Sequence, residues 1–191
     1  MKLFGSQTSP YVRRIRLALA DTPYQLIMLN IFDGPDRATL IKYNPVRKVP
    51  MLLDGAQLVF DSGVIYRYLA EKFDWPKLSW AEENQVTVIN AANDSMVELL
   101  LCKRSGLDID PKKLFYSLQH ERVEGAFKVL EQQVILGQYD QWNYSSIALY
   151  CLLDWALYRE LISLDAFIHL EQFHQKNQQQ PFVAESDPRL G

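Results

Sequence analysis

Three short segments in the first third of the chain carry groups that could do chemistry together. Ser9-Pro10 is typical of a helix N-cap followed by proline at the first helical position. A hydroxyl held at the positive end of a helix can donate a hydrogen bond to a thiolate. Val49-Pro50 and Asp61-Ser62 follow, and both offer groups that can bind a peptide-like ligand.

Val49-Pro50 stands at the start of a predicted hairpin. The apolar run after it and a second run ending at Phe60 are separated by Asp54-Gly55, which predicts two buried strands. A proline is tolerated at the first residue of a strand, where its missing N–H costs least. If the Val49-Pro50 bond is cis, the amide and carbonyl of Val49 turn outward and can pair with an extended peptide.

Asp61-Ser62 opens the next predicted helix. Apolar residues then recur at helical spacing, which predicts one buried face made of Val64, Ile65, Tyr68 and Leu69. At the start of this helix, Ser62 offers a hydroxyl and unpaired backbone N–H groups to a carboxylate. The Asp61 carboxylate can cap the helix and favours its dipole.

The order of the elements predicts a thioredoxin-like domain. A strand at residues 1–5, a helix after Ser9 and a strand at residues 24–29 precede the hairpin and the helix after Asp61. Redox proteins of this fold place Cys-x-x-Cys where this chain has Ser9-Pro10-Tyr11-Val12. No cysteine occurs there, which excludes thiol–disulfide exchange by a protein cysteine at this position.

Bulk properties describe an ordinary globular protein. The 191 residues are 48% hydrophobic and 23% charged, and no apolar run approaches the roughly 18 residues that span a bilayer. The start of the chain lacks a secretory apolar region, and Cys102 and Cys151 lie in apolar helical patterns as expected for buried thiols. We therefore expect a cytoplasmic protein without membrane association.

Charge is distributed unevenly along the chain. Residues 1–75 carry ten Lys and Arg against seven Asp and Glu, a net +3, whereas the rest carries a net −6. The mildly positive part suits a small anionic ligand, although solvated surface charge explains most of these residues. The count is too low to indicate a nucleic-acid partner.

The second half predicts helices only. The segment from Phe73 to Lys77 breaks the helical pattern and indicates a linker. Helices are predicted at residues 81–103, from Asp110-Pro111 to near Gly137, at residues 147–161 and at residues 165–176. We expect a thioredoxin-like domain at residues 1–74 and an all-helical domain at residues 79–191.

Four of these pieces, in this order and spacing, resemble the glutathione S-transferase family. They are the segment 8–14 around Ser9, the Asn44–Lys48 segment, the Val49-Pro50-Met51-Leu52 run and Asp61-Ser62. The resemblance continues more weakly to the end of the chain. It implies glutathione as co-substrate with no further cofactor, a small hydrophobic electrophile held between the domains, and a homodimer.

By this resemblance, Ser9 is the residue that activates the thiol of glutathione. Serine-type transferases use the hydroxyl to stabilise the bound thiolate, which lowers the pKa of the thiol by about one or two units. Other classes use a tyrosine, so Tyr11 is the rival donor. Its place inside the helix fits aromatic packing better.

The resemblance also implies the residues that bind glutathione. Val49 pairs through its backbone beside Pro50, and Lys48 is placed to meet the glycyl carboxylate, unless it is an ordinary solvated lysine. Asp61 accepts from the γ-glutamyl ammonium, with less reach than the glutamate common in the family. Ser62 binds the γ-glutamyl carboxylate.

Two function classes remain open at this point. The first is a glutathione transferase, and the second is a non-catalytic, regulatory protein of the same fold that resembles stringent starvation protein. No metal site is expected, because His120, His169 and His174 have no paired cysteine or glutamate motif. Near Asn143 the family carries a capping aspartate where this chain has Ser146, which is expected to weaken that cap.

Overall fold

The computed structural model describes residues 1–190 and divides the chain into two compact units. The first unit holds residues 1–77 together with the tail that begins at Gln178, and the second runs from Leu78 to Asn177. The break after Lys77 follows the segment that interrupts the helical pattern. The tail differs from the expectation, since the predicted second domain ran to residue 191.

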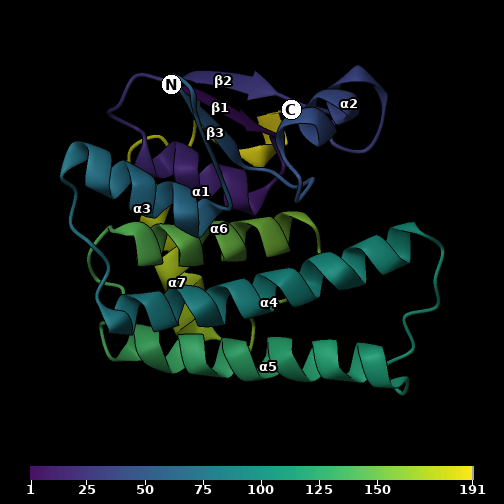
Figure 1. Ribbon diagram of the computed structural model, residues 1–191. Helices are drawn as coiled ribbons and strands as arrows, with labels where there is room; N and C mark the ends of the chain where they lie inside the picture. The colour runs from purple at the N-terminus through teal and green to yellow at the C-terminus, as the bar shows by residue number, and fades with distance from the viewer. Residues whose placement is uncertain (191) are drawn as a thin grey trace. The chain divides into compact units, whose positions relative to one another are not determined.

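The first unit is a thioredoxin-like α/β domain (Figure 1). Its four strands lie in the order β2-β1-β3-β4, with β1 parallel to β2 and antiparallel to β3, and with β3 and β4 forming a hairpin. The connections alternate strands and helices as the sequence predicts. In chain order the elements are β1 (Lys2–Gly5), α1 (Pro10–Ala18), β2 (Gln25–Met28), α2 (Gly34–Tyr43), β3 (Met51–Asp54), β4 (Gln57–Phe60) and α3 (Ser62–Phe73).

Apolar side chains from the sheet and from α1 and α3 form the core of this unit. All of the following are fully buried: Leu3, Ile15, Leu19, Leu52, Ile65 and Leu69. Burying each of them stabilises the fold by about 1.5–3 kcal/mol relative to an exposed side chain. This core fixes where α1 and α3 begin relative to the strand ends.

Two details of this unit differ from the sequence-based expectation. The Asp33–Asp36 segment has the composition of a turn, yet α2 begins within it, because Pro35 suits the first turn of a helix and Gly34 supplies the left-handed backbone (φ +70) that leads into it. On α3, Val64 is 41% exposed, and Tyr66 is buried instead. The Tyr66 ring lies 6.2 Å from that of Trp75, and its hydroxyl donates to the carbonyl of Pro76 (3.2 Å), which explains the shift of the buried face.

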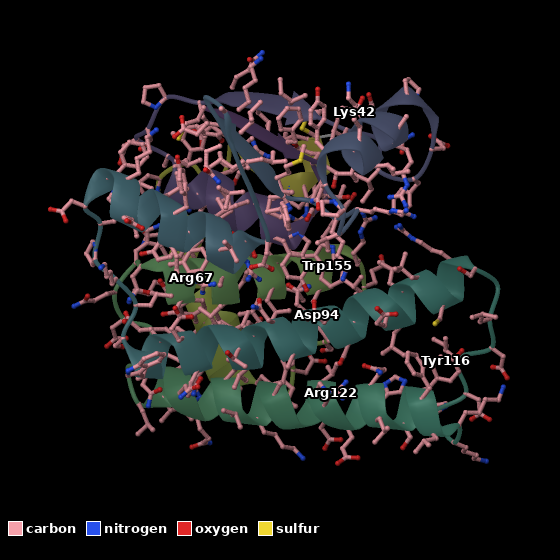
Figure 2. All side chains as sticks on the ribbon, in the orientation of Figure 1. Lys42, Arg67, Asp94, Tyr116, Arg122 and Trp155 are labelled. Atoms are coloured by element: carbon pink, nitrogen blue, oxygen red, sulfur yellow. The ribbon has the colours of Figure 1, made fainter. Side chains whose placement is uncertain are left out.

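The described residues of the second unit form helices joined by loops, without a strand. The helices are α4 (Trp80–Arg104), α5 (Leu114–Ile135), α6 (Tyr144–Tyr158) and α7 (Ile168–Asn177). Helix α6 is apolar nearly all round and almost completely buried, as expected for a central helix. Helices α4 and α5 lie side by side in Figure 1. Arg122, labelled on α5 in Figure 2, donates to Ser95 Oγ of α4 (3.0 Å) and to Gln119 Oε1 (2.8 Å).

The starts of α4 and α6 share one carboxylate. Ser79 and Glu82 form a capping box at α4, in which Glu82 Oε2 accepts from the Ser79 N–H (2.7 Å). The other oxygen of Glu82 accepts from Asn143 Nδ2 (2.8 Å) at the N-cap of α6. Asn143 and Ser146 form a second box with both reciprocal bonds, at 3.2 and 2.8 Å. The serine therefore completes this cap, contrary to the expected weakening.

Helix α5 begins later than predicted. The segment after Pro111 is a turn, in which Asp110 Oδ1 accepts from the Lys112 N–H (3.0 Å), and the helix starts at Leu114. Asp110-Pro111 has the pattern of an N-cap followed by a proline at the first helical position, which predicted the wrong start for this helix. In the structure, Asp110 stabilises a turn and does not cap a helix.

Cys151 is buried as expected, whereas Cys102 is only half-buried. Among the described residues, no helix is long and apolar enough to cross a membrane.

Candidate functional site

One edge of the sheet brings together the three segments that the sequence singled out. Phe4, near the end of β1, pairs with Met51 at the start of β3, and Met51 pairs with Phe60 at the end of β4. The loop after β1, the residues before β3 and the residues after β4 therefore leave the sheet at the same edge. Ser9 lies in the first of these segments, Val49-Pro50 in the second and Asp61-Ser62 in the third.

Ser9 is the N-cap of α1. Its backbone is extended (φ −83°, ψ 122°), its Oγ accepts from the Val12 N–H at 3.3 Å, and Pro10 occupies the first helical position. A serine hydroxyl that accepts one hydrogen bond keeps its proton for donation. The half-buried Ser9 therefore presents a donor beside the positive end of α1.

Gly5 lets α1 approach the end of β1 closely. A Cβ built on Gly5 would come within 2.4 Å of Val12 Cγ1, a distance that forces neighbouring atoms to move. Ser9 caps the Val12 N–H. The close approach of Val12 to Gly5 therefore also sets how far Ser9 lies from the end of the sheet. Only glycine gives this spacing.

Buried Asn44 holds the loop that precedes Val49. Its Oδ1 accepts from the Val46 N–H (2.9 Å), and its Nδ2 donates to the carbonyl of Lys48 (2.7 Å). The Val49-Pro50 bond that follows is cis. Neither the N–H nor the carbonyl of Val49 makes a hydrogen bond to any described residue. An extended peptide could pair with both groups.

Asp61 and Ser62 form the start of α3. Asp61 has φ 74°, a left-handed value rare for a residue with a side chain, and its Oδ1 accepts from the N–H groups of Gly63 (2.9 Å) and Val64 (3.1 Å). Ser62 is only 2% exposed, and its hydroxyl makes no hydrogen bond within residues 1–190. A bound group can therefore accept from this hydroxyl without displacing a protein partner.

The nearby charges favour an anionic ligand. Lys48 is exposed, and its ammonium forms no ion pair with the described residues. Arg14 lies over the ring of Tyr11 at 4.9 Å from its centroid, so this ring is packed against a buried guanidinium. That contact agrees with the packing role expected for Tyr11. Within residues 1–190, no cluster of His, Cys, Asp and Glu could hold a metal ion.

Comparisons with known proteins point to one family. Residues 3–77 match the family model described as glutathione S-transferase, N-terminal domain. A glutathione S-transferase (hmp2) of Hypomyces subiculosus is 35% identical over 39% of this chain and 35% of its own length. The GST-like protein YibF of Escherichia coli is 26% identical over 84% of both chains. A glutathione S-transferase of Methylobacillus flagellatus, solved with GSH bound, gives a TM-score of 0.84 at 19% identity over 98% of both chains.

The first part of this chain therefore carries a glutathione S-transferase N-terminal domain.

The aligned part spans about a third of the length of the curated glutathione S-transferases matched first, namely 35%, 32% and 34%. The solved structures, at identities below 25%, support the transferase fold over almost the whole chain. The family assignment therefore rests on the first unit, which is also the unit that carries the candidate site.

Sequence reasoning missed three residues that support this candidate site. Asn44 belongs to the quoted motif, but its role in holding the Lys48 carbonyl was not predicted; an asparagine before proline is a known turn signal that could have indicated it. Gln7 and Arg16 contact each other and the tail of the chain. No local pattern reveals these contacts, because the tail lies far away in the sequence.

Proposed function

We propose that this protein binds glutathione at the candidate site and transfers its thiol to a small hydrophobic electrophile. The observation that carries the proposal is the pair of unengaged backbone groups on Val49, placed between two helix starts. Glutathione is a short anionic peptide with a thiol at its centre. A backbone pair with hydroxyls and helix N-termini on either side provides the groups that such a peptide needs.

Each end of the peptide has a counterpart in the site. The N–H and carbonyl of Val49, next to Pro50, pair with the cysteinyl backbone of the ligand. Ser62 donates to the γ-glutamyl carboxylate, and Asp61, whose Oδ2 is not used in capping α3, accepts from the γ-glutamyl ammonium. Lys48 meets the glycyl carboxylate. These roles use groups that lack partners among the described residues.

Ser9 acts on the sulfur in this proposal. Its hydroxyl donates to the thiolate, and a hydrogen bond to a charged group contributes roughly 1.5–3 kcal/mol. The thiol proton is released to solvent, and the thiolate attacks the electrophilic carbon. One C–S bond forms, and the leaving group departs with its electron pair. Ser9 stabilises charge in this step and does not take up the proton.

The proposal includes a homodimer in the cytoplasm with no nucleic-acid partner. Exposed apolar side chains on α3 and at the start of α4, namely Val64 (41%) and Trp80 (87%), support self-association. Light scattering at micromolar concentration is expected to give twice the 22.2 kDa mass of one chain. The mass of a single chain would contradict the dimer.

Calorimetry with glutathione tests the proposed binding site. We expect micromolar to millimolar binding by the unaltered chain, and about tenfold weaker binding by Ser62→Ala and Lys48→Ala, because each variant removes a donor to a ligand carboxylate. Ser117→Ala, on the exposed face of α5, and Lys42→Ala, on α2, are the matched controls.

Absence of binding at millimolar glutathione would contradict the proposed function. That result, with a folded protein, would favour a non-catalytic member of the fold. If the site variants and their controls lose the same affinity for glutathione, Ser62 and Lys48 do not contact the ligand. The proposal that the protein binds glutathione would still stand.

A further inference from the structure

The tail of the chain is tied to α1 by two buried arginines. Arg13 donates from Nε to Ser186 Oγ (3.1 Å) and from Nη2 to the Val183 carbonyl (3.0 Å). Arg16 donates from Nη2 to the Glu185 carbonyl (3.1 Å). Both arginines are at most 6% exposed. The end of the chain, yellow in Figure 1, thus belongs to the unit that carries the candidate site.

These contacts explain how cationic side chains can be buried on α1. A guanidinium removed from water is costly unless acceptors replace its hydration. For Arg16 the acceptors are the Glu185 carbonyl and Gln7 Oε1 (3.1 Å), and the hydroxyl of Tyr24 lies beside it. Without the tail, Arg16 would lose one of these acceptors and would turn toward solvent.

Gln7 connects the tail to the loop that carries Ser9. Its Nε2 donates to the Asp187 carbonyl (2.8 Å), and its Oε1 accepts from Arg16 Nη1 (3.1 Å), so both ends of the amide are held. Within the loop, the Ser9 N–H donates to the Ser6 carbonyl in one long hydrogen bond (3.3 Å), and the Ser9 carbonyl accepts from the Arg13 N–H of α1 (3.0 Å). Gln7 is therefore the side chain that ties the middle of this loop to the tail and to α1.

We propose that the tail, acting through Gln7 and Arg16, positions the Ser9 hydroxyl for thiol activation, and that Gln7 is a positioning residue of the site. This inference rests on the proposed function, in which Ser9 stabilises the bound thiolate. The groups assigned to glutathione binding lie on Lys48, Val49, Asp61 and Ser62, and none of them forms a hydrogen bond with Gln7 or the described part of the tail. Loosening the loop therefore reduces turnover and leaves glutathione affinity unchanged.

The test compares Gln7→Met with Gln57→Met. The methionine at position 7 keeps the volume of the side chain and removes both hydrogen bonds. Gln57, on β4, is exposed and makes a single amide contact, with the Leu58 carbonyl (3.3 Å), so it controls for the same chemical change in the same unit. Ser9→Ala is the reference for complete loss of the hydroxyl.

We expect Gln7→Met to lower kcat about tenfold, because small displacements of a reacting group reduce the rate steeply. The pKa of bound glutathione, followed by thiolate absorbance in the ultraviolet, should rise toward its value in Ser9→Ala. The dissociation constant for glutathione should stay within about twofold. A variant that ends at Gln180 should shift kcat and the bound-thiol pKa in the same direction. Melting curves of all variants establish that they are folded.

The outcomes separate this inference from the proposed function. Unchanged kcat and unchanged bound-thiol pKa in folded Gln7→Met, with both shifted in Ser9→Ala, would overturn the positioning role alone. If Ser9→Ala also leaves both unchanged, the proposed role of Ser9 fails, and this inference fails with it. A lower melting temperature of Gln7→Met and of the shortened chain, without a shift of the bound-thiol pKa, would show that the tail only stabilises the fold. That result would also overturn the inference.

Discussion

Two helix starts at the edge of the sheet are capped in different ways. At α1, Ser9 has an ordinary extended backbone and accepts one long hydrogen bond of 3.3 Å. At α3, Asp61 has φ 74° and accepts two hydrogen bonds of 2.9 and 3.1 Å through one oxygen. The first cap is loose and keeps a proton available, whereas the second is tight and strained.

This difference suits two kinds of chemistry. Residues in rarely populated backbone regions cost about 1–3 kcal/mol each and persist where the surrounding structure holds them, often at binding sites. At Asp61 the cap offsets about 1 kcal/mol of that cost and fixes the carboxylate. We interpret α3 as a rigid frame for the γ-glutamyl end of the ligand and α1 as the adjustable donor to its sulfur.

Ser9→Ala should give the largest effect. The lost hydrogen bond to a charged sulfur corresponds to a decrease of kcat by about 10- to 100-fold near neutral pH. The bound thiol should have a raised pKa, so activity should partly recover as the pH rises. The measurement is turnover with an electrophilic test substrate between pH 6.5 and about pH 9, accompanied by melting curves, since the lost cap costs about 1 kcal/mol.

Ser117→Ala, on α5, is the matched control for that substitution. Turnover equal to that of the unaltered protein across the pH range, in folded Ser9→Ala, would contradict the role of the hydroxyl. Tyr11 or the backbone N–H groups at the start of α1 would then be the remaining donors.

Asp61 should show a smaller, separable effect. Asp61→Asn keeps an oxygen that can cap α3 and removes the negative charge, so we expect about tenfold weaker glutathione binding with nearly unchanged stability. Asp61→Ala should add a stability loss of about 1 kcal/mol. Calorimetry and urea unfolding measure the two quantities. Asp33→Asn at the start of α2, where the side chain makes no cap bond, is the control.

If Asp61→Asn and Asp61→Ala lower the free energy of unfolding by the same amount, the hydrogen bonds from the Gly63 and Val64 N–H groups do not stabilise the start of α3. If Asp61→Asn binds glutathione as tightly as the unaltered protein does, the charge plays no part in recognition, and the comparison between the two helix starts loses its functional meaning.

The smallest effect is expected at a third helix start, in the second unit. Glu131 of α5 caps α7 from outside, accepting from the N–H groups of His169 (3.0 Å) and Leu170 (2.9 Å) and contacting His169 Nδ1 at 2.7 Å. Burial raises the pKa of Glu131, but these hydrogen bonds outweigh burial, and the net pKa is lowered. The carboxylate therefore stabilises the folded state above the ordinary Glu pKa of about 4.3, and this contribution is lost as the pH falls through the lower folded-state pKa.

Glu131→Gln should lower the free energy of unfolding by about 1 kcal/mol at pH 7. The difference in unfolding free energy between this variant and the unaltered protein should narrow at a pH below the ordinary Glu pKa of about 4.3, because the native carboxylate takes up its proton as the pH falls through its lowered pKa. Urea unfolding at the two pH values measures this difference, with Glu121→Gln, at an exposed position of the same helix, as control. A difference that is equal at both pH values would show that the charge of Glu131 does not stabilise α7.

Much of the first unit follows from local sequence signals. The hairpin, the helix starts at Ser9 and Ser62 and the order of the elements along the chain follow from short apolar runs, from Asp54-Gly55 and from capping residues, all of which act over a few positions. The Asn44 loop was recognised only as part of a motif. Its hydrogen bonds to the backbone become visible once the loop conformation is known.

The surroundings of α1 could not be predicted in this way. Arg13 and Arg16 lie mostly off the apolar face that helical spacing gives this helix, a place typical of solvated residues, yet both are buried. Their acceptors lie about 170 positions further along the chain, at Val183 and Glu185. A long-range contact of this kind leaves no periodic signal, so sequence reasoning missed both the tail and the support that it gives to Gln7.

The single carboxylate of Glu82, which bonds to the starts of both α4 and α6, couples the unfolding of two helices that are far apart in the sequence. If the first turn of α4 frays, Asn143 loses its acceptor, and if α6 frays, Glu82 loses a donor. The two helix ends should therefore open together as one cooperative unit, with similar amide hydrogen-exchange rates in both first turns. The Glu82 side chain alone thus makes the formation of the first turn of α4 depend on that of α6.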